Sequence, residues 1–157
     1  MKMVVTLIAG LAVVVLGLGA YVRLAPSDPA YWSVDPEQIA NPVDERHFLL
    51  RPVDGDAAGP VYGVSPEAVL AAFDAVAQAA PRTSVLAGSV ASGQITYISR
   101  SSLWGFPDYI SVRAVPVAEG AALAIYSRSR FGKSDLGVNK ARIEDWLAQL
   151  DDSLGRR

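Results

Sequence analysis

The longest hydrophobic run of the chain stands at its beginning. Residues 3–22 contain no charged residue, and a helix of about 20 apolar residues is long enough to cross the hydrocarbon core of a bilayer. The run is longer than the apolar part of a typical signal peptide, and its nearest small-residue pattern, Leu18-Gly19-Ala20, begins with a bulky leucine. The pattern therefore favours an uncleaved transmembrane anchor over residues 1–23, with a cleaved signal peptide as the alternative.

Hydrophobic periodicity is lost after this run. Residues 24–60 hold six of the ten prolines and more acidic than basic residues, so we expect a mostly extended linker. Its one apolar group, residues 47–50, can dock on the domain that follows. The neighbouring sequence offers His47 no catalytic partner, and we interpret this histidine as a surface or docking residue.

Regular patterns return at residue 61. Ser65-Pro66-Glu67 is typical of a helix start, with a hydroxyl cap, a proline at the first position and a carboxylate in the first turn. Pro81 ends this helix. One face of it is apolar, through Val69, Leu70, Phe73, Val76 and Ala77.

Four strand-like runs and a second helix complete the chain. The runs cover residues 83–90, 94–101, 109–117 and 121–128, and the short turns between them favour antiparallel pairing. The second helix, about 139–153, is amphipathic. The predicted fold class is therefore α+β. It consists of an N-terminal transmembrane helix and a two-layer α-β-β-β-β-α domain over residues 61–157, with two helices covering a four-stranded antiparallel sheet.

Composition then narrows the function classes. A net charge of -2 argues against a nucleic-acid partner. The absence of cysteine excludes thiol catalysis and disulfides, and a single histidine excludes a histidine-rich metal site. We therefore predict no cofactor and no metal. A Ser-His-Asp arrangement lacks support, and a pair of Lys133 with Ser134 or Ser129 would need a desolvated lysine. An enzyme is the less favoured interpretation.

Charge also bears on localisation. Lys2 precedes the apolar run, while Arg23 and then several acidic residues follow it. The positive-inside rule leans towards a cytoplasmic N-terminus. Arginine outnumbers lysine eleven to three, which is typical of a GC-rich bacterial genome. We expect a single-pass protein of the bacterial inner membrane with its domain in the periplasm.

Polar residues converge at one end of the predicted sheet. In an up-and-down meander the second and fourth strands run the same way, and they end in Ser99-Arg100-Ser101 and Ser127-Arg128-Ser129. We therefore expect Arg100 and Arg128 at the same end, near the start of the last helix. The predicted ligand-binding residues are Arg100, Trp104, Phe106, Asp108, Arg128, Arg130, Lys133, Asp135, Asn139 and Arg142.

Two interpretations of this end stay open. Arginine side chains bind phosphate or carboxylate through two parallel hydrogen bonds, and a helix N-terminus adds positive potential. The end would then bind an anionic small molecule, a lipid headgroup or an envelope protein, with Trp104 and Phe106 as an apolar wall. In the alternative, Asp108 and Asp135 pair with the arginines, and the same residues only hold the sheet to the last helix in a structural or assembly module.

Several of these motifs occur together in one known family. They are Arg82-Thr83, Tyr97, residues 100–108, residues 126–130 and residues 134–143. With them the chain resembles the domain-of-unknown-function family 1499 over about residues 63–150. The family usually carries a second acidic residue where this chain has Tyr109, which disfavours a paired-carboxylate metal site. The resemblance implies a bacterial or plastid envelope protein, often with N-terminal membrane segments, and no established activity, substrate or cofactor.

Overall fold

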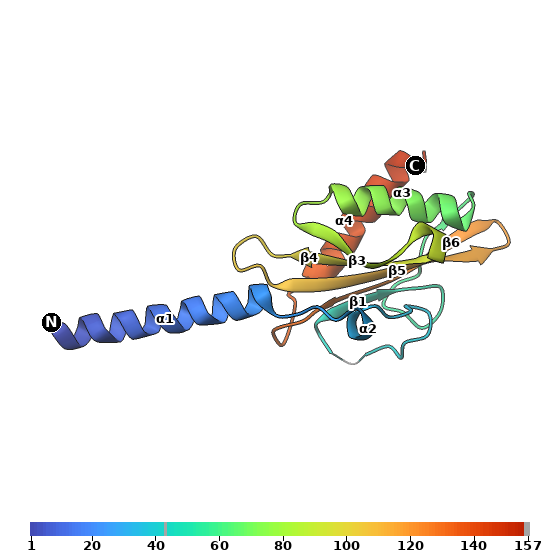
Figure 1. Cartoon of the computed structure of the whole chain (residues 1–157). Helices are drawn as coiled ribbons and strands as arrows, with labels where there is room; N and C mark the ends of the chain where they lie inside the picture. Colours follow the sequence, from blue (N-terminus) through green and yellow to red (C-terminus); the bar gives the residue numbers. More distant parts are fainter. Residues whose placement is uncertain (43, 156–157) are drawn as a thin grey trace.

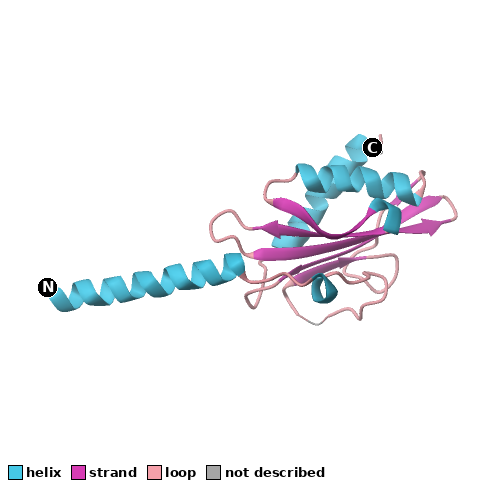
Figure 2. Ribbon diagram, viewed as in Figure 1, coloured by secondary structure: helices cyan, strands magenta, loops and turns pink. Residues whose placement is uncertain are grey.

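The chain forms a two-layer α+β domain from which one long helix projects (Figures 1 and 2). The structure is a computed structural model and describes residues 1–42 and 44–155. The elements in chain order are α1 (Lys2–Leu24), α2 (Pro29–Trp32), β1 (His47–Leu50), β2 (Val61–Tyr62), α3 (Pro66–Ala79), β3 (Thr83–Ser89), the 3-10 helix η1 (Val90–Ser92), β4 (Gln94–Arg100), β5 (Pro107–Val117), β6 (Gly120–Ser129) and α4 (Val138–Ser153).

The sheet has the order β1-β6-β5-β4-β3, with β2 paired to β6 at the far end of that strand, and every pairing is antiparallel. The expected four strands are present as β3 to β6. The expectation that they form the whole sheet is wrong, because β1 and β2 extend it beyond β6. Pairing with β1 covers what would otherwise be an exposed edge with unpaired backbone groups, and Phe48, Leu49 and Leu50 become buried there.

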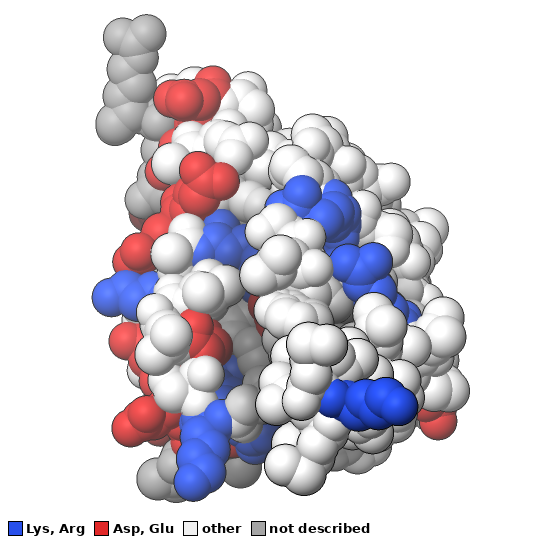
Figure 3. Space-filling view, turned by 90° about the vertical axis from the view of Figure 1, so that its left-hand side faces the viewer, with Lys and Arg blue, Asp and Glu red and all other residues white. Residues whose placement is uncertain are grey.

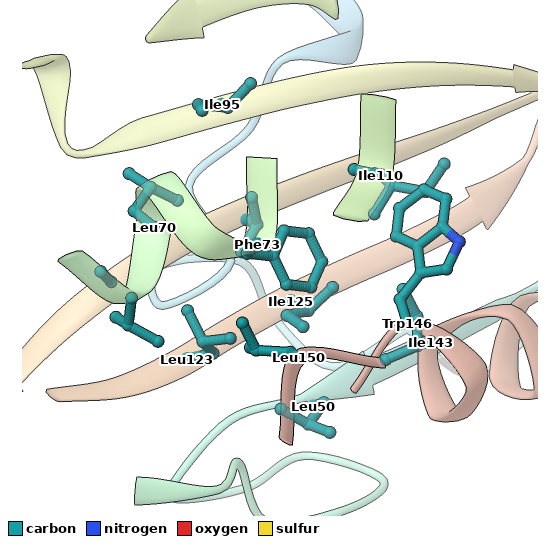
Figure 4. Packing of buried hydrophobic residues seen from close by; sticks show 14 of the residues in the cluster. Leu50, Leu70, Phe73, Ile95, Ile110, Leu123, Ile125, Ile143, Trp146 and Leu150 are labelled. Atoms are coloured by element: carbon teal, nitrogen blue, oxygen red, sulfur yellow. The ribbon is translucent and has the colours of Figure 1, made fainter. Parts of the chain in front are cut away.

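Helices α3 and α4 cover one face of this sheet (Figure 1). α3 starts as the sequence indicates, since the Ser65 hydroxyl accepts a hydrogen bond from the backbone N–H of Ala68. The apolar faces of the helices meet the sheet in one core, where Phe73 and Trp146 lie over Ile110 and Ile125 (Figure 4). Burial and a hydrogen bond from the Tyr97 hydroxyl to Asp74 raise the pKa of that phenol, which stays neutral and ties β4 to α3.

The opposite face is covered by residues that the sequence pattern assigns to an extended linker. Trp32 stacks on Tyr109 with ring centroids 3.9 Å apart. Further along, the buried side chain of Arg51 donates to the carbonyls of Pro36, Glu37 and Ile39. The segment is largely irregular, as expected, but it is packed against the sheet beside α2 (Figure 2). Its hydrogen bonds and ring contacts reach residues distant in sequence, so no local period announces them.

Helix α1 leaves the domain at one end of the sheet (Figure 1). It has 23 residues, and its most apolar 18-residue stretch has a mean hydropathy of 2.6, so its length and composition suffice to cross a membrane, a property that a signal sequence shares. Most of its apolar side chains are exposed, and Val22 near its end is buried. Only contacts at the last turns therefore fix the direction in which the helix leaves.

Candidate functional site

The end of the sheet at which α1 leaves also carries most of the predicted ligand-binding residues. Arg100 is the last residue of β4 and pairs with Pro107, while Arg128 of β6 pairs with Tyr109 two residues further along β5. Both arginines thus lie at the same end, as strand direction predicts. The arginine side chains and their partners nevertheless form three groups. Alternation along β5 and β6 puts Asp108 on the face opposite Arg128 and Arg130, and Arg100 stands at the end of β4, beside the open end of the sheet.

The first group lies under the helices. Arg142 of α4 donates to a carboxylate oxygen of Asp108 at 2.6 Å, and both side chains are largely buried. Arg142 also donates to the amide oxygen of Asn139, which accepts a second hydrogen bond from the Ser127 hydroxyl at 2.6 Å. The amide nitrogen of Asn139 donates to Ser129. This buried network joins α4 to β5 and β6.

Asp135 belongs to the start of α4 and not to an arginine pair. Its carboxylate accepts hydrogen bonds from the backbone N–H groups of Gly137 and Asn139. It thereby satisfies backbone donors that a helix start leaves without partners. Asp135 and the buried network fit the structural interpretation of this end, and Lys133, in the loop just before, is exposed.

The second group lies on the opposite face of the sheet. The guanidinium carbon of Arg128 is 4.6 Å from the centre of the Trp32 ring, and Arg128 donates to the carbonyl of Tyr31. Arg130 donates to the carbonyl of Pro26 at 2.8 Å and to the Tyr109 hydroxyl at 3.3 Å. These two arginines therefore hold the segment around α2 on the sheet.

The third group lines an open cleft, for which we use the name arginine cleft. Two adjoining pockets, of about 460 and 470 Å³, share the residues Arg82, Thr83, Arg100, Ser101 and Ser102. One pocket extends towards Arg142 and Trp146 of α4. The other extends towards Arg23 at the end of α1, and no carboxylate is among its described lining residues. This cleft is where guanidinium and hydroxyl groups converge on open space.

Backbone carbonyls hold the cleft arginines in place. The Nε of Arg82 donates to the carbonyl of Arg100 at 3.1 Å, and Nη1 of Arg100 donates to the carbonyl of Gly105 at 3.0 Å. A guanidinium has five N–H donors, and within the described part of the chain the remaining donors of Arg82 and Arg100 make no further hydrogen bond. The cleft therefore offers positioned donors to an anion.

Arg82 carries a second unusual property. Its backbone has φ +57°, a left-handed conformation that costs an L-residue other than glycine or asparagine about 1–2 kcal/mol. Such strain persists only where the surrounding structure holds it in place, and Asp54 and Leu136, outside the cleft, have similar φ values. Arg82 and Arg23 were not among the predicted ligand-binding residues. The Arg82-Thr83 block of the family pattern was the available signal for Arg82, and none pointed to Arg23.

The side chains of Trp104 and Phe106 line a separate groove and not the arginine cleft. With Val15, Leu18, Gly19 and Val22 of α1 they line an apolar groove of about 220 Å³. Phe106 also lies 5.9 Å from the Phe131 ring, centroid to centroid. The loop 101–106 separates this groove from the cleft, and the side chain of Arg23 donates to its carbonyls at Leu103 and Trp104.

His47 differs from the sequence interpretation. Its ring nitrogens lie 3.3 Å from Asp44, 3.3 Å from Asn41 and 3.6 Å from Asp56. The expectation that His47 has no partner is therefore wrong, since the strand β1 brings in residues from both of its ends. No serine is among these partners, and the described residues hold no cluster of histidine, aspartate and glutamate suited to a metal ion.

Comparison with known proteins adds the family and the fold. The family model described as Protein of unknown function (DUF1499) matches residues 25–150, so the match begins well before residue 63 and takes in β1 and the segment around α2. No curated protein matches the chain significantly.

Two solved structures match the chain in the comparison of structures. Protein MLL2253 from Mesorhizobium loti has a TM-score of 0.52 at 11% identity and covers 71% of this chain and 98% of its own. Protein CV1439 from Chromobacterium violaceum has a TM-score of 0.45 at 16% identity, with 69% and 97% covered. The likeness to MLL2253 shows a shared fold and carries no function.

Proposed function

The chain belongs to the DUF1499 family of proteins of unknown function, and from that premise we propose that it is a membrane-tethered, non-enzymatic domain that binds an anionic group in the arginine cleft. Helix α1 is the tether, in keeping with its length and hydropathy. The proposal includes the envelope location inferred from the sequence, with the N-terminus of α1 in the cytoplasm and the domain in the periplasm.

One observation carries the proposal. Arg82 and Arg100 approach the same open cleft with their positions fixed by backbone carbonyls, and the cleft adds the hydroxyls of Thr83, Ser101 and Ser102. Planar guanidinium groups match the geometry of phosphate and carboxylate oxygens, and hydroxyls supply further donors. The ligand is therefore a phosphate- or carboxylate-bearing molecule.

The structural alternative rests on a different observation, the buried network of Asp108, Asn139 and Arg142. Its members use their polar groups on each other, which suits a module whose polar end only joins α4 to the sheet. The two functions make different demands on Arg82, because Arg82 takes no part in that network. Binding needs its guanidinium, whereas the structural module does not.

The test is thermal unfolding of the full chain in neutral-detergent micelles, with inorganic phosphate replacing chloride at constant ionic strength. Binding should raise the Tm by about 4 °C at roughly ten times the dissociation constant, since it contributes about 1.4 kcal/mol there. The variant Arg82→Gly should lose this shift. Its own Tm should stay near that of the wild type, because glycine relieves the left-handed strain at the cost of one exposed hydrogen bond.

A matched control is Lys140→Gln, which removes a positive charge from the exposed side of α4, outside the cleft. It should keep the full phosphate shift. Equal shifts in wild type, Arg82→Gly and Lys140→Gln would show only a general salt effect, and the anion-binding proposal would then be wrong.

A further inference from the structure

The arginine cleft and the apolar groove meet at the loop 101–106. The groove is almost entirely apolar, and the Trp104 ring lies against Gly19, with ring atoms 3.7 Å from where a Cβ at that position would stand. Arg23 connects the two features, because its side chain lines the cleft and also donates to the carbonyls of Leu103 and Trp104. A charged pocket and a hydrocarbon-lined groove thus share one loop.

Their position relative to a bilayer follows from the geometry of α1. Gly19 precedes Arg23 by one helical turn, about 5–6 Å along the axis. If residues 3–22 span the hydrocarbon core, Trp104 lies at the level of the last apolar turn, where tryptophan is enriched in membrane proteins. Leu103, next to it, has 74% of its surface exposed. The loop therefore stands in the membrane interface, with Arg23 at headgroup height.

Charge at this end favours an anionic partner. Figure 3 looks onto the end from which α1 leaves, where lysine and arginine side chains lie in several groups, while the carboxylates gather mostly along one margin. The pocket next to α1 holds Arg23, Arg82 and Arg100 with no carboxylate among its described lining residues. Three guanidiniums beside a bilayer attract negatively charged headgroups over a Debye length.

We infer that the cleft and the groove together bind one anionic phospholipid of the surrounding bilayer. Its phosphate lies among Arg23, Arg82 and Arg100, and one acyl chain lies in the groove between α1 and the side chains of Trp104 and Phe106. This inference rests on the proposed function and names the ligand of the same cleft. A soluble phosphate monoester would satisfy the arginines but would leave the apolar groove without an occupant.

The experiment uses the full chain in bilayer nanodiscs of phosphatidylcholine, with a minor fraction of lipid brominated in its acyl chains. The brominated lipid is either phosphatidylcholine or phosphatidylglycerol, and the readout is quenching of Trp104 emission, obtained by subtracting the signal of Trp104→Phe. Phosphatidylglycerol should quench more strongly at equal fraction. Arg82→Gly should weaken this preference about tenfold, the loss expected for a charge-assisted hydrogen bond of about 1.4 kcal/mol.

The groove is tested by filling it. Gly19→Leu adds a bulky side chain beside the Trp104 ring, on the wall of the groove, and should reduce quenching by both lipids. Gly10→Leu is the matched control on the same helix, since a Cβ at Gly10 meets nothing within 4 Å, and it should leave quenching unchanged. Both variants keep α1 apolar, so membrane insertion is not altered.

The outcomes separate this inference from the proposed function. If inorganic phosphate gives an Arg82-dependent rise in Tm but phosphatidylglycerol is not preferred, the cleft binds a soluble anion and the lipid inference is wrong. If Gly19→Leu and Gly10→Leu behave alike, no acyl chain occupies the groove, and the inference is again wrong. If neither the phosphate-induced rise in Tm nor the preference for phosphatidylglycerol depends on Arg82, both the lipid inference and the proposed function are wrong.

Discussion

Asp44 illustrates the residue scale, where a single side chain sets a dependence on pH. Burial tends to raise its pKa, but hydrogen bonds from the backbone N–H of Arg46 and from the His47 ring outweigh it and hold the pKa below the usual 3.8. A carboxyl group with a lowered pKa stabilises the fold above its unfolded pKa. That contribution is lost as the pH falls through the folded pKa.

We therefore expect Asp44→Asn to lower the Tm at neutral pH, and the difference from the wild type to shrink as the pH falls below 3.8. Thermal unfolding followed over this acid range measures it. Glu144→Gln serves as control, because the ion pair of Glu144 with Lys140 is long, at 3.8 Å, and exposed, so it should contribute little at any pH. A difference for Asp44→Asn that grows on acidification would contradict the assignment.

At the scale of elements, Arg128 decides how residues 25–34 are held. Its guanidinium stacks on Trp32 and donates to the carbonyl of Tyr31, while Trp32 itself stacks on Tyr109. Arg128→Ala should lower the free energy of unfolding by about 1–3 kcal/mol through loss of the cation–π contact and the hydrogen bond. Arg128→Lys should give a smaller loss, because it keeps the charge but not the planar stack.

Urea unfolding measured by circular dichroism gives these free energies. Arg113→Ala is the comparison, since Arg113 also contacts the segment before β1, through ion pairs with Asp35 and Glu37. Ion pairs of this kind at the surface contribute little to the free energy of unfolding. Should Arg128→Ala prove no more harmful than Arg113→Ala, the role of Arg128 in holding residues 25–34 on the sheet would be refuted.

The predicted elements show where sequence reasoning succeeds. The two helices and the strands β3 to β6 have the order and the approximate bounds that periodicity indicates. β1 and β2 have four and two residues, too few for an alternating pattern to stand out. The need for glycine at position 120 is likewise not predictable from the sequence. A Cβ there would lie 2.0 Å from the carbonyl oxygen of Tyr62 in β2, and only the folded structure brings these two residues together.

At the scale of the whole molecule, a reporter fusion tests on which side of the membrane the domain lies. With the N-terminus of α1 in the cytoplasm, a reporter fused after Arg157 should be active only if it works in the periplasm. Alkaline phosphatase and a fluorescent protein that matures only in the cytoplasm give opposite readings of the same fusion. Fluorescence without phosphatase activity would place the domain in the cytoplasm. Release of the domain from washed membranes would instead indicate a cleaved signal peptide.

Local pattern by itself determined the apolar helix, the two amphipathic helices, the four long strands and the family resemblance, because each is encoded in neighbouring residues. It also placed Arg100 and Arg128 at one end of the sheet, since strand direction follows from short turns. Tertiary structure alone decided what each arginine faces. Arg128 stacks on Trp32, Arg142 pairs with Asp108, and Arg100 lines one pocket with Arg82 and Arg23. These partners come from distant parts of the chain, and only packing of the two layers and α1 brings them together.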